Sequence, residues 1–395
     1  MTIRLISMLG ALTALSVVLG CGDSGDGPSG GSGGSSGGAG AGPATGGSNP
    51  GQGGGGGTPG TGGNPSTGGN GTGGTPGTGG SVNVGGEGGG PTAPEGAYFP
   101  PGAWMYQDIS AAPVSASSST TTQWLQNNGG WGTGQMRIDF SIEVLSATAS
   151  TPFLDFQPTG DFYDPDCDQV PMPVPVGGAL EGEAGYECLS DGDCHLIVRD
   201  DAGGRLYEMW RANIVGNTFY GGCLAAWDMT RVYGAAGRGE QCSSADAAGF
   251  PIAPLLFSAD EVAAGEIAHA IRFILPNARM RAGYYAHPGT HAGGPSGPSQ
   301  APVYGSRWRL RADYPLASLP SEGARVVARA MQKYGMALAD GGSIALTGQS
   351  DRFPTAKWSG LLDSYDLSDL QPTDFEVVDT GAPITLTYDC VRTPY

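Results

Sequence analysis

A glycine-rich segment limits what this chain can fold into more than any other feature. From Gly22 to about Glu95 the chain is almost entirely Gly, Ser, Thr, Pro, Asn and Ala, and it contains no aromatic residue. Such a segment cannot bury enough apolar surface to offset the entropy lost when its backbone is ordered, so we expect disorder. As a flexible coil it would span about 45–50 Å. Residues 21–95 are therefore predicted to be a linker, and a folded domain must lie in residues 96–395.

The residues before the linker have the layout of a secretory signal peptide. Residues 1–20 carry one positive charge, Arg4, followed by the mostly apolar run Leu9–Leu19. A run of roughly eleven residues is too short to span a bilayer. The end of this segment, Val18-Leu19-Gly20-Cys21, resembles the bacterial lipobox, in which the cysteine is lipidated. The resemblance implies a lipid anchor on Cys21 and a place in the bacterial cell envelope outside the cytoplasm, at the outer membrane or the cell surface.

The charge balance excludes one class of partner. The chain has 19 basic and 37 acidic residues, of which 18 basic and 33 acidic residues lie in the region 96–395. A domain this acidic lacks the basic surface that nucleic-acid binding requires. Bulk repulsion also opposes a highly charged polyanionic glycan, so a neutral polymer is the favoured ligand.

The cysteines indicate an exported domain with disulfides. Besides Cys21 there are six: Cys167, Cys188, Cys194, Cys223, Cys242 and Cys390. An even number in an exported domain predicts three disulfides, for which fifteen pairings exist. No C-x-x-C pair occurs, so neither a zinc knot nor a thioredoxin-like site is expected.

Several segments alternate polar and apolar residues with the period of a β-strand. Met136–Val144 and Arg307–Tyr314 are the most regular, and a last strand is predicted at Ile384–Cys390. His195–Asp200 and Arg205–Ala212 predict a hairpin, because the glycines between them permit the positive φ that such turns require. We expect a mainly β fold: one β-sandwich or jelly-roll-like domain over residues 96–395, with one long helix and short helices.

Two helices are predicted. The longer spans Glu322–Ala339, with Ser321 as its N-cap and Gly341 as the left-handed residue that ends it. The shorter spans Ala259–Ala264, between a capping box and Gly265.

Ionisable side chains gather among apolar neighbours around residues 243–273. If Glu266–Leu275 is a strand, Glu266 and Arg272 share one face, and His269 lies on the other with apolar residues. A histidine there is either a satisfied core residue or a site residue at the bottom of a cleft. A neutral imidazole in a cleft could take or give a proton near neutral pH.

Several motifs resemble those of a family of secreted bacterial proteins without an assigned mechanism, some of which are joined to carbohydrate-binding modules. The matching runs lie from Asp191 onward: Asp191–His195, Ser244–Gly249, Gly265–Phe273, Lys333–Met336 and Asp374–Asp379. The family pattern includes a histidine followed by a small residue, which best fits His291-Ala292, with His287 as the alternative. The resemblance implies a glycan context.

The favoured chemistry is cleavage of a glycosidic bond in an extracellular polysaccharide. A carboxyl group with a raised pKa would protonate the leaving oxygen. Glu266 is the candidate acid, and Asp246 or Asp193 is its partner. We expect His195, His269 and His291 (or His287) to converge with Glu266 on one pocket.

Two alternatives remain open. A lyase would eliminate across a uronate, with His269 or Tyr284 as the base and Arg272 neutralising the carboxylate, but the negative domain disfavours such a substrate. A non-catalytic surface glycan-binding module or adhesin would need no such groups. The arginines at 307, 309 and 311 predict either a solvent face or a basic stripe for an anionic glycan.

No cofactor and no catalytic metal are expected. The zincin pattern H-E-x-x-H is absent, and the two histidines of His287-Pro288-Gly289-Thr290-His291 lie in a loop. Asp164, Asp166 and Asp168 alternate as at the start of a calcium loop, but the glycine and the distal glutamate of an EF-hand are missing. A solvated acidic turn is expected there, with a structural calcium ion as the alternative.

Overall fold

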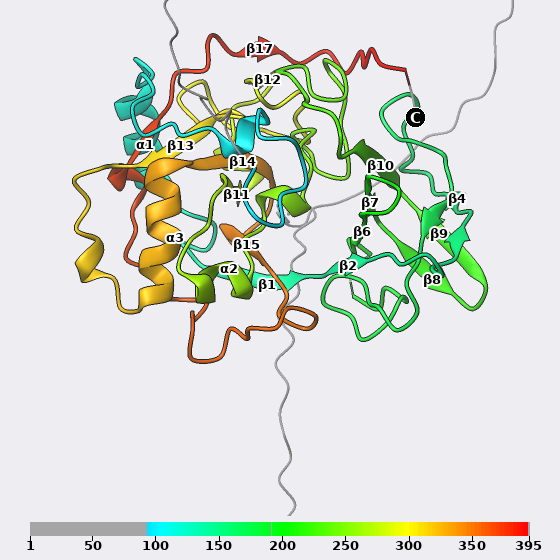
Figure 1. Ribbon diagram of the computed structural model, residues 1–395. Coiled ribbons are helices and arrows are strands. Elements are labelled where there is room, and N and C mark those ends of the chain that lie inside the picture. The colour runs from blue at the N-terminus through cyan, green and yellow to red at the C-terminus, as the bar shows by residue number, and fades with distance from the viewer. Residues whose placement is uncertain (1–92, 191, 394–395) are drawn as a thin grey trace, which may run out of the picture. The chain divides into compact units, whose positions relative to one another are not determined.

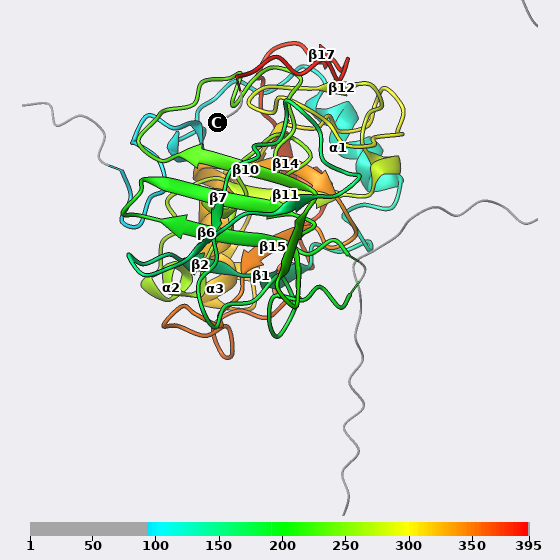
Figure 2. The same ribbon diagram turned by 90° about the vertical axis from the view of Figure 1, so that its right-hand side faces the viewer.

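Two β-sheets face each other in the computed structural model, which describes residues 93–190 and 192–393 (Figures 1 and 2). The predicted signal peptide, Cys21 and nearly all of the predicted linker lie outside the described residues. The described residues from 93 onward belong to one compact unit. The fold is mainly β, as the sequence predicts.

The larger sheet has six strands. In spatial order they are β1 (Ile138–Ile142), β15 (Leu346–Gln349), β11 (Ile271–Leu275), β14 (Met336–Gly341), β13 (Arg307–Leu310) and β16 (Phe375–Val377). The sheet is mixed: β1 pairs with β15 and β11 pairs with β14 in parallel, while the other neighbours are antiparallel. The parallel strands need crossover connections, which the alternation pattern alone does not reveal.

The smaller sheet has four strands, β10 (Cys223–Asp228), β7 (Arg205–Trp210), β6 (Leu196–Asp200) and β2 (Val144–Ser146). The predicted hairpin is confirmed, since β6 pairs with β7 in antiparallel register. The two faces of the four-stranded sheet pack against different hydrophobic cores. Ile197, Leu206 and Trp227 join the main core, whereas Leu196, Val198 and Met209 face a smaller core under the segment 152–188.

The six-stranded sheet lies between helices and the second sheet. Figures 1 and 2 show α3 (Glu322–Lys333) on one side of it and the four-stranded sheet on the other. One face of the larger sheet carries aromatic rings, with Trp131 5.9 Å from Phe273 and 5.3 Å from Phe375. The other face carries polar side chains, which the site below uses.

The remaining elements are short. They are η1 (Trp104–Tyr106), α1 (Ser118–Asn127), β3 (Phe153–Leu154), β4 (Gln157–Pro158), β5 (Met172–Pro173), β8 (Asn213–Val215), β9 (Thr218–Gly221), η2 (Ala253–Leu255), α2 (Ala259–Ala264), η3 (Asn277–Arg279), β12 (Tyr284–Tyr285), η4 (Leu316–Ser318), η5 (Pro372–Asp374) and β17 (Ile384–Thr385). The strand predicted over residues 384–390 is thus limited to its first two residues. Among the described residues, no helix is long and apolar enough to cross a bilayer.

Helix α2 has the predicted ends, whereas α3 is shorter than predicted. In α2, Ser258 and Glu261 form the capping box and Gly265 ends the helix at φ 89°. Ser321 caps α3 as expected, but α3 ends at Lys333, and Gly335 takes the left-handed conformation at φ 71°. The predicted end at Gly341 is wrong, because residues 336–341 form β14 beside β11.

Three disulfides are present, as predicted. The pairs are Cys167–Cys223, Cys188–Cys194 and Cys242–Cys390. Disulfides persist in oxidising compartments, so the pairing favours a location outside the cytoplasm.

Candidate functional site

A short loop between the two sheets gathers three of the predicted site residues. The Ala245 carbonyl accepts from His195 Nε2 at 3.2 Å, and the Asp246 carboxylate accepts from Arg272 Nη2 at 2.7 Å. One residue further, the Ala247 carbonyl lies 2.9 Å from His291 Nδ1. The loop thus contacts His195, Arg272 and His291 through three consecutive residues.

His195 is held as a cation by two acceptors. Its Nδ1 lies 2.6 Å from Glu181 Oε2, and its Nε2 faces the Ala245 carbonyl. Because both partners accept, both ring nitrogens must carry protons. Burial alone would lower the pKa of His195, but the charge and hydrogen bond of Glu181 outweigh it and raise this pKa to about 9. A histidine held in the charged form cannot accept a proton as a general base near neutral pH.

Glu181 is held in the ionised form. Burial would raise its pKa, but the charge of His195 and the His195 hydrogen bond, with help from Arg272 and Ser141, lower it below its usual range. The Glu181 side chain keeps 23% of its exposure and that of His195 keeps 11%, so solvent reaches the pair.

A second carboxyl group lies close to Glu181 and is shifted the opposite way. Asp139 and Ser141 share one face of β1, the edge strand of the six-stranded sheet. The Ser141 hydroxyl lies 2.9 Å from Asp139 Oδ2 and 3.2 Å from Glu181 Oε1. Burial and the negative charge of Glu181 raise the pKa of Asp139 above its usual value, and the Ser141 hydrogen bonds offset this only partly.

One hydroxyl group lies within hydrogen-bond distance of both carboxyl groups. Ser141 has one hydroxyl proton and can donate fully to only one acceptor. When that proton points to Glu181, the contact with Asp139 becomes a hydrogen bond only if Asp139 is protonated and donates to Ser141 Oγ. A proton on Asp139 would let Ser141 bridge both carboxyl groups, and the raised pKa of Asp139 is a shift in that direction.

Behind this pair lies a buried ion-pair network. Arg272, 5% exposed, pairs with Asp246 and donates to Thr347 Oγ1 at 3.2 Å. Arg272 Nη2 also lies 3.9 Å from Asp340, whose side chain is 29% exposed. Burial raises the pKa of Asp246 to about 7 and that of Asp340 above its usual value, and the charge of Arg272 limits both shifts. The network fixes the loop that holds His195.

Glu266 does not join this cluster. The expected strand over 266–275 begins only at Ile271, and Glu266 lies exposed just after α2. Within the described residues, no hydrogen bond or ion pair links Glu266 to His195 or Asp246. The expectation that it shares a face with Arg272 is wrong, because the capping turn at Gly265 leads the chain into irregular backbone instead of a strand.

His269 is a satisfied core residue instead of a cleft residue. It is 7% exposed, and its ring nitrogens contact the Ala270 carbonyl at 2.8 Å and Glu261 at 3.0 Å. Burial would lower the pKa of His269, but the charge of Glu261 raises it. His269 therefore links the first turn of α2 to the residues just before β11.

The other candidates lie at separate places. Asp193 accepts from Trp210 Nε1 at 2.5 Å. His287 pairs with Glu240 at 2.7 Å, and Tyr284 lies in β12 under the Arg281 guanidinium. Burial lowers the pKa of His291, so this histidine differs from His195 although both contact the same loop. The predicted convergence of His195, His269 and His291 (or His287) with Glu266 on one pocket is not observed.

The arginine ladder is neither a solvent face nor a binding stripe along its whole length. Arg307 is 4% and Arg309 is 7% exposed; the first donates to the Tyr334 carbonyl, and the second pairs with Glu376. Arg311 alone is solvated, in an ion pair with Asp313. The N-terminal segment of the domain contacts the first two. Arg309 donates to the carbonyl groups of residues 109, 110 and 112, and the Arg307 guanidinium lies over the Trp104 ring.

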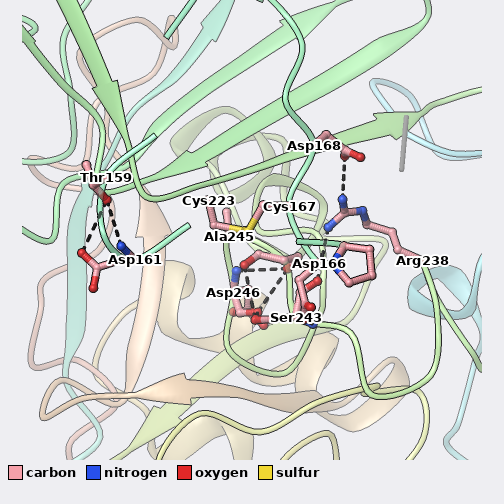
Figure 3. Close-up of a disulfide and its surroundings, with 12 residues drawn as sticks. Thr159, Asp161, Asp166, Cys167, Asp168, Cys223, Arg238, Ser243, Ala245 and Asp246 are labelled. Carbon is pink, nitrogen blue, oxygen red and sulfur yellow. Dashed lines mark hydrogen bonds and ion pairs between the residues drawn. A yellow bond between two sulfur atoms is a disulfide. The ribbon is translucent and has the colours of Figure 1, made fainter. Parts of the chain in front are cut away.

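The acidic turn at residues 164–168 is buried at its end, contrary to the expected solvated turn. Asp168 is fully buried and pairs with Arg238 and Arg392, as Figure 3 shows for Arg238. Asp166 accepts from the Ser243 backbone N–H at 2.7 Å. Two arginines therefore provide the countercharge that the calcium alternative assigns to a metal ion.

One group of potential metal ligands occurs in the described part of the chain: Glu183, Cys188 and Cys194. The two cysteines are joined in a disulfide, so they offer no thiolate. This group does not fit a metal site.

Asp139, Ser141, Glu181 and Asp340 are the site residues that sequence reasoning missed. A signal existed for two of them, because the alternation of 136–144 places Asp139 and Ser141 on one strand face. Nothing local indicates that Glu181, in irregular backbone, reaches that face.

No family model, no curated protein sequence and no solved structure matches this chain. The resemblance to secreted bacterial proteins with carbohydrate-binding modules stays a prediction.

Proposed function

We propose that this protein is an envelope-anchored hydrolase of extracellular polysaccharide, with Asp139 as the general acid and Glu181 as the nucleophile. The observation that carries the proposal is a pair of neighbouring carboxyl groups whose pKa values are shifted in opposite directions. Such a division assigns one group as the proton donor and the other as the ionised partner. Glycosidic bond cleavage uses this combination.

The spacing of the pair favours a retaining mechanism. Both carboxyls contact the Ser141 oxygen, at 2.9 and 3.2 Å, so Asp139 Oδ2 and Glu181 Oε1 are at most 6.1 Å apart. Retaining enzymes hold their carboxyls roughly 5–5.5 Å apart, and inverting enzymes leave about 6.5–9.5 Å for a water. We therefore expect the product to keep the anomeric configuration of the substrate.

The two steps balance with these groups alone. Asp139 gives its proton to the glycosidic oxygen while Glu181 bonds to the anomeric carbon, and the leaving chain departs as an alcohol. Water then attacks that carbon, Asp139 accepts its proton, and Glu181 leaves as a carboxylate. His195, paired with the other oxygen of Glu181, keeps the nucleophile ionised and oriented.

The cellular setting supports a glycan substrate outside the cytoplasm. Three disulfides fit an oxidising compartment. A lipid on Cys21 would hold the enzyme at the membrane, and the predicted linker would let the domain reach polymer nearby. The outer membrane or the cell surface is the proposed location.

The lyase alternative has less support in the geometry. Arg272, which would neutralise a uronate, is buried and already paired with Asp246. A non-catalytic adhesin remains the outcome if the protein binds glycan without turnover.

The test is a panel of neutral and anionic polysaccharides incubated with the purified protein. Reducing ends, product mass and ultraviolet absorbance distinguish hydrolysis, elimination and binding alone. We expect hydrolysis of a neutral polymer with retained configuration. Glu181→Gln and Asp139→Asn should lower kcat at least ~100-fold, whereas Glu187→Gln, an exposed carboxylate on the same loop, is the matched control. Full activity in Glu181→Gln, or cleavage of no polymer by the native protein, contradicts the proposal.

The pH profile provides a second signature. The pKa of Glu181 lies below its usual range, so activity should fall in acid as Glu181 takes up a proton. The pKa of Asp139 lies above its usual value, so activity should fall as rising pH removes the Asp139 proton. We expect a bell-shaped dependence of kcat/KM whose alkaline limb is abolished or displaced in Asp139→Asn.

A further inference from the structure

A surface groove lies on the opposite side of β1 from the proposed catalytic pair. Its volume is about 510 Å³, and it is lined by Phe140, Ser321 and residues 358–364 and 366. This volume falls within the roughly 300–1,000 Å³ range of small-ligand sites.

The floor of the groove is a rigid aromatic pair. The rings of Phe140 and Trp358 stack with their centroids 4.4 Å apart. Trp358 is fixed further, because its Nε1 donates to the Gln349 carbonyl and its backbone N–H donates to Asp351. A floor fixed in this way loses little side-chain entropy when a ligand binds.

Two carboxylates on the rim are each held by one oxygen. Asp366 Oδ2 accepts from Ser321 Oγ at 2.6 Å and from the Asp363 backbone N–H at 3.2 Å. Asp363 Oδ1 accepts from the Tyr365 backbone N–H at 3.0 Å. Within the described part of the chain, no hydrogen bond engages the second oxygen of either carboxylate. These oxygens are oriented acceptors for donors of a ligand.

The composition of the groove selects among ligands. Aromatic and aliphatic side chains suit the C–H faces of sugar rings, while the carboxylates and the hydroxyls of Ser359 and Ser364 suit sugar hydroxyls. No lysine or arginine lines the groove, and its two carboxylates repel an anionic sugar.

We propose that this groove is a binding subsite for a segment of neutral polysaccharide. The choice of a sugar ligand rests on the proposed function. Strand β1 carries Phe140 into the groove and Asp139 and Ser141 on its other face, so a polymer that passes over this edge strand would contact both places. The subsite would hold a long chain while one of its bonds lies at the catalytic pair.

The experiment measures binding and hydrolysis separately. The probes are hexasaccharides of the cellulose, xylan, mannan and laminarin types, with an oligogalacturonate as the anionic comparison. Binding is followed by calorimetry with Glu181→Gln as the background, so that cleavage does not interfere. Ser359→Trp fills the groove from an exposed position, and Asp363→Ala removes one acceptor. Ser299→Trp, an exposed position between β12 and β13, is the matched control.

We expect one or more neutral hexasaccharides to bind. Ser359→Trp should weaken that binding at least tenfold, and Asp363→Ala should weaken it less. Ser299→Trp should leave the binding unchanged. Binding of the oligogalacturonate alone, binding of none of the probes, or unchanged binding in both groove variants overturns the subsite. Circular dichroism and the three disulfides verify that each variant folds.

The experiments distinguish failure of the subsite proposal from failure of the hydrolase proposal. If groove variants lose glycan binding but the native protein cleaves no polymer, the subsite stands and the hydrolase is wrong. If Glu181 is required for hydrolysis while Ser359→Trp binds and cleaves polymer normally, the hydrolase stands and the subsite is wrong.

Discussion

Two clusters of charged residues near the four-stranded sheet contain similar groups but differ in how far solvent reaches them. Asp168 is fully buried between Arg238 and Arg392 and also accepts from the Ala226 backbone N–H at 3.0 Å. Glu181, by contrast, keeps 23% of its side-chain exposure beside a partly exposed His195.

The difference is one of access and countercharge. The Asp168 carboxylate is fully buried and is neutralised by two arginines whose side chains are only 3% and 6% exposed. It joins the C-terminal segment to the rest of the domain, next to the Cys167–Cys223 disulfide (Figure 3). Glu181 lies next to a second carboxyl group, Asp139, whose pKa is raised by burial and by the charge of Glu181. A closed cluster of this kind stabilises, whereas an open one with divided protonation can do chemistry.

Removal of Asp168 should produce the largest change in stability. Asp168→Ala leaves two buried guanidinium groups without their carboxylate, so the free energy of unfolding should fall by about 3–5 kcal/mol. Chemical denaturation with the disulfides intact measures this. Arg311→Ala, which breaks an exposed pair, is the control and should change stability by less than ~0.5 kcal/mol. A loss under ~1 kcal/mol for Asp168→Ala would remove the contrast between the clusters.

Opening the Cys188–Cys194 disulfide should affect the Glu181 cluster more than the Asp168 cluster. Cys194 directly precedes His195, and the two cysteines of the disulfide are only 6 positions apart in the sequence. The paired change Cys188→Ser and Cys194→Ser should lower the free energy of unfolding by about 2 kcal/mol. Because His195 should lose its fixed position, glycan hydrolysis should also fall. Unchanged hydrolysis would show that this disulfide does not support the site.

The smallest expected effect is a pH dependence confined to the Glu181 cluster. The pKa of folded His195 is raised from 6.5 to about 9, so its contribution is complete below pH 6.5 and is lost as pH rises toward 9. The stability difference between the native protein and His195→Gln should therefore shrink by about 1–2 kcal/mol over that range. The difference between the native protein and Asp168→Ala should stay constant, because arginines keep their charge. Equal pH dependence in both comparisons would contradict the assignment.

Local sequence patterns correctly predicted the elements whose ends are set by residues close together in the sequence. The capping box and Gly265 define α2, and alternation with a glycine turn defines the β6–β7 hairpin, because these signals act over a few residues. The longer helix shows the limit. Gly335 and Gly341 are equally good terminators in sequence, and only the pairing of residues 336–341 with β11 decides between them.

The candidate site shows the same limit more strongly. Asp246 and Arg272 could be recognised as polar residues in apolar surroundings, but their partners could not. Glu181 reaches Ser141 across 40 residues of sequence, and His195 reaches Ala245 across 50. Such distances are set by how the two sheets pack, and no periodicity encodes them.

The amino-acid sequence by itself determined the β-rich class and the number of disulfides, because alternation patterns and the cysteine count carry this information without knowledge of the tertiary contacts. Only the tertiary structure decided which carboxyl groups are neighbours. It places Asp139 and Glu181 on either side of the Ser141 hydroxyl and leaves Glu266 exposed. The physical reason is that a pKa depends on burial and on charges a few ångströms away, and both come from contacts between segments far apart in the chain.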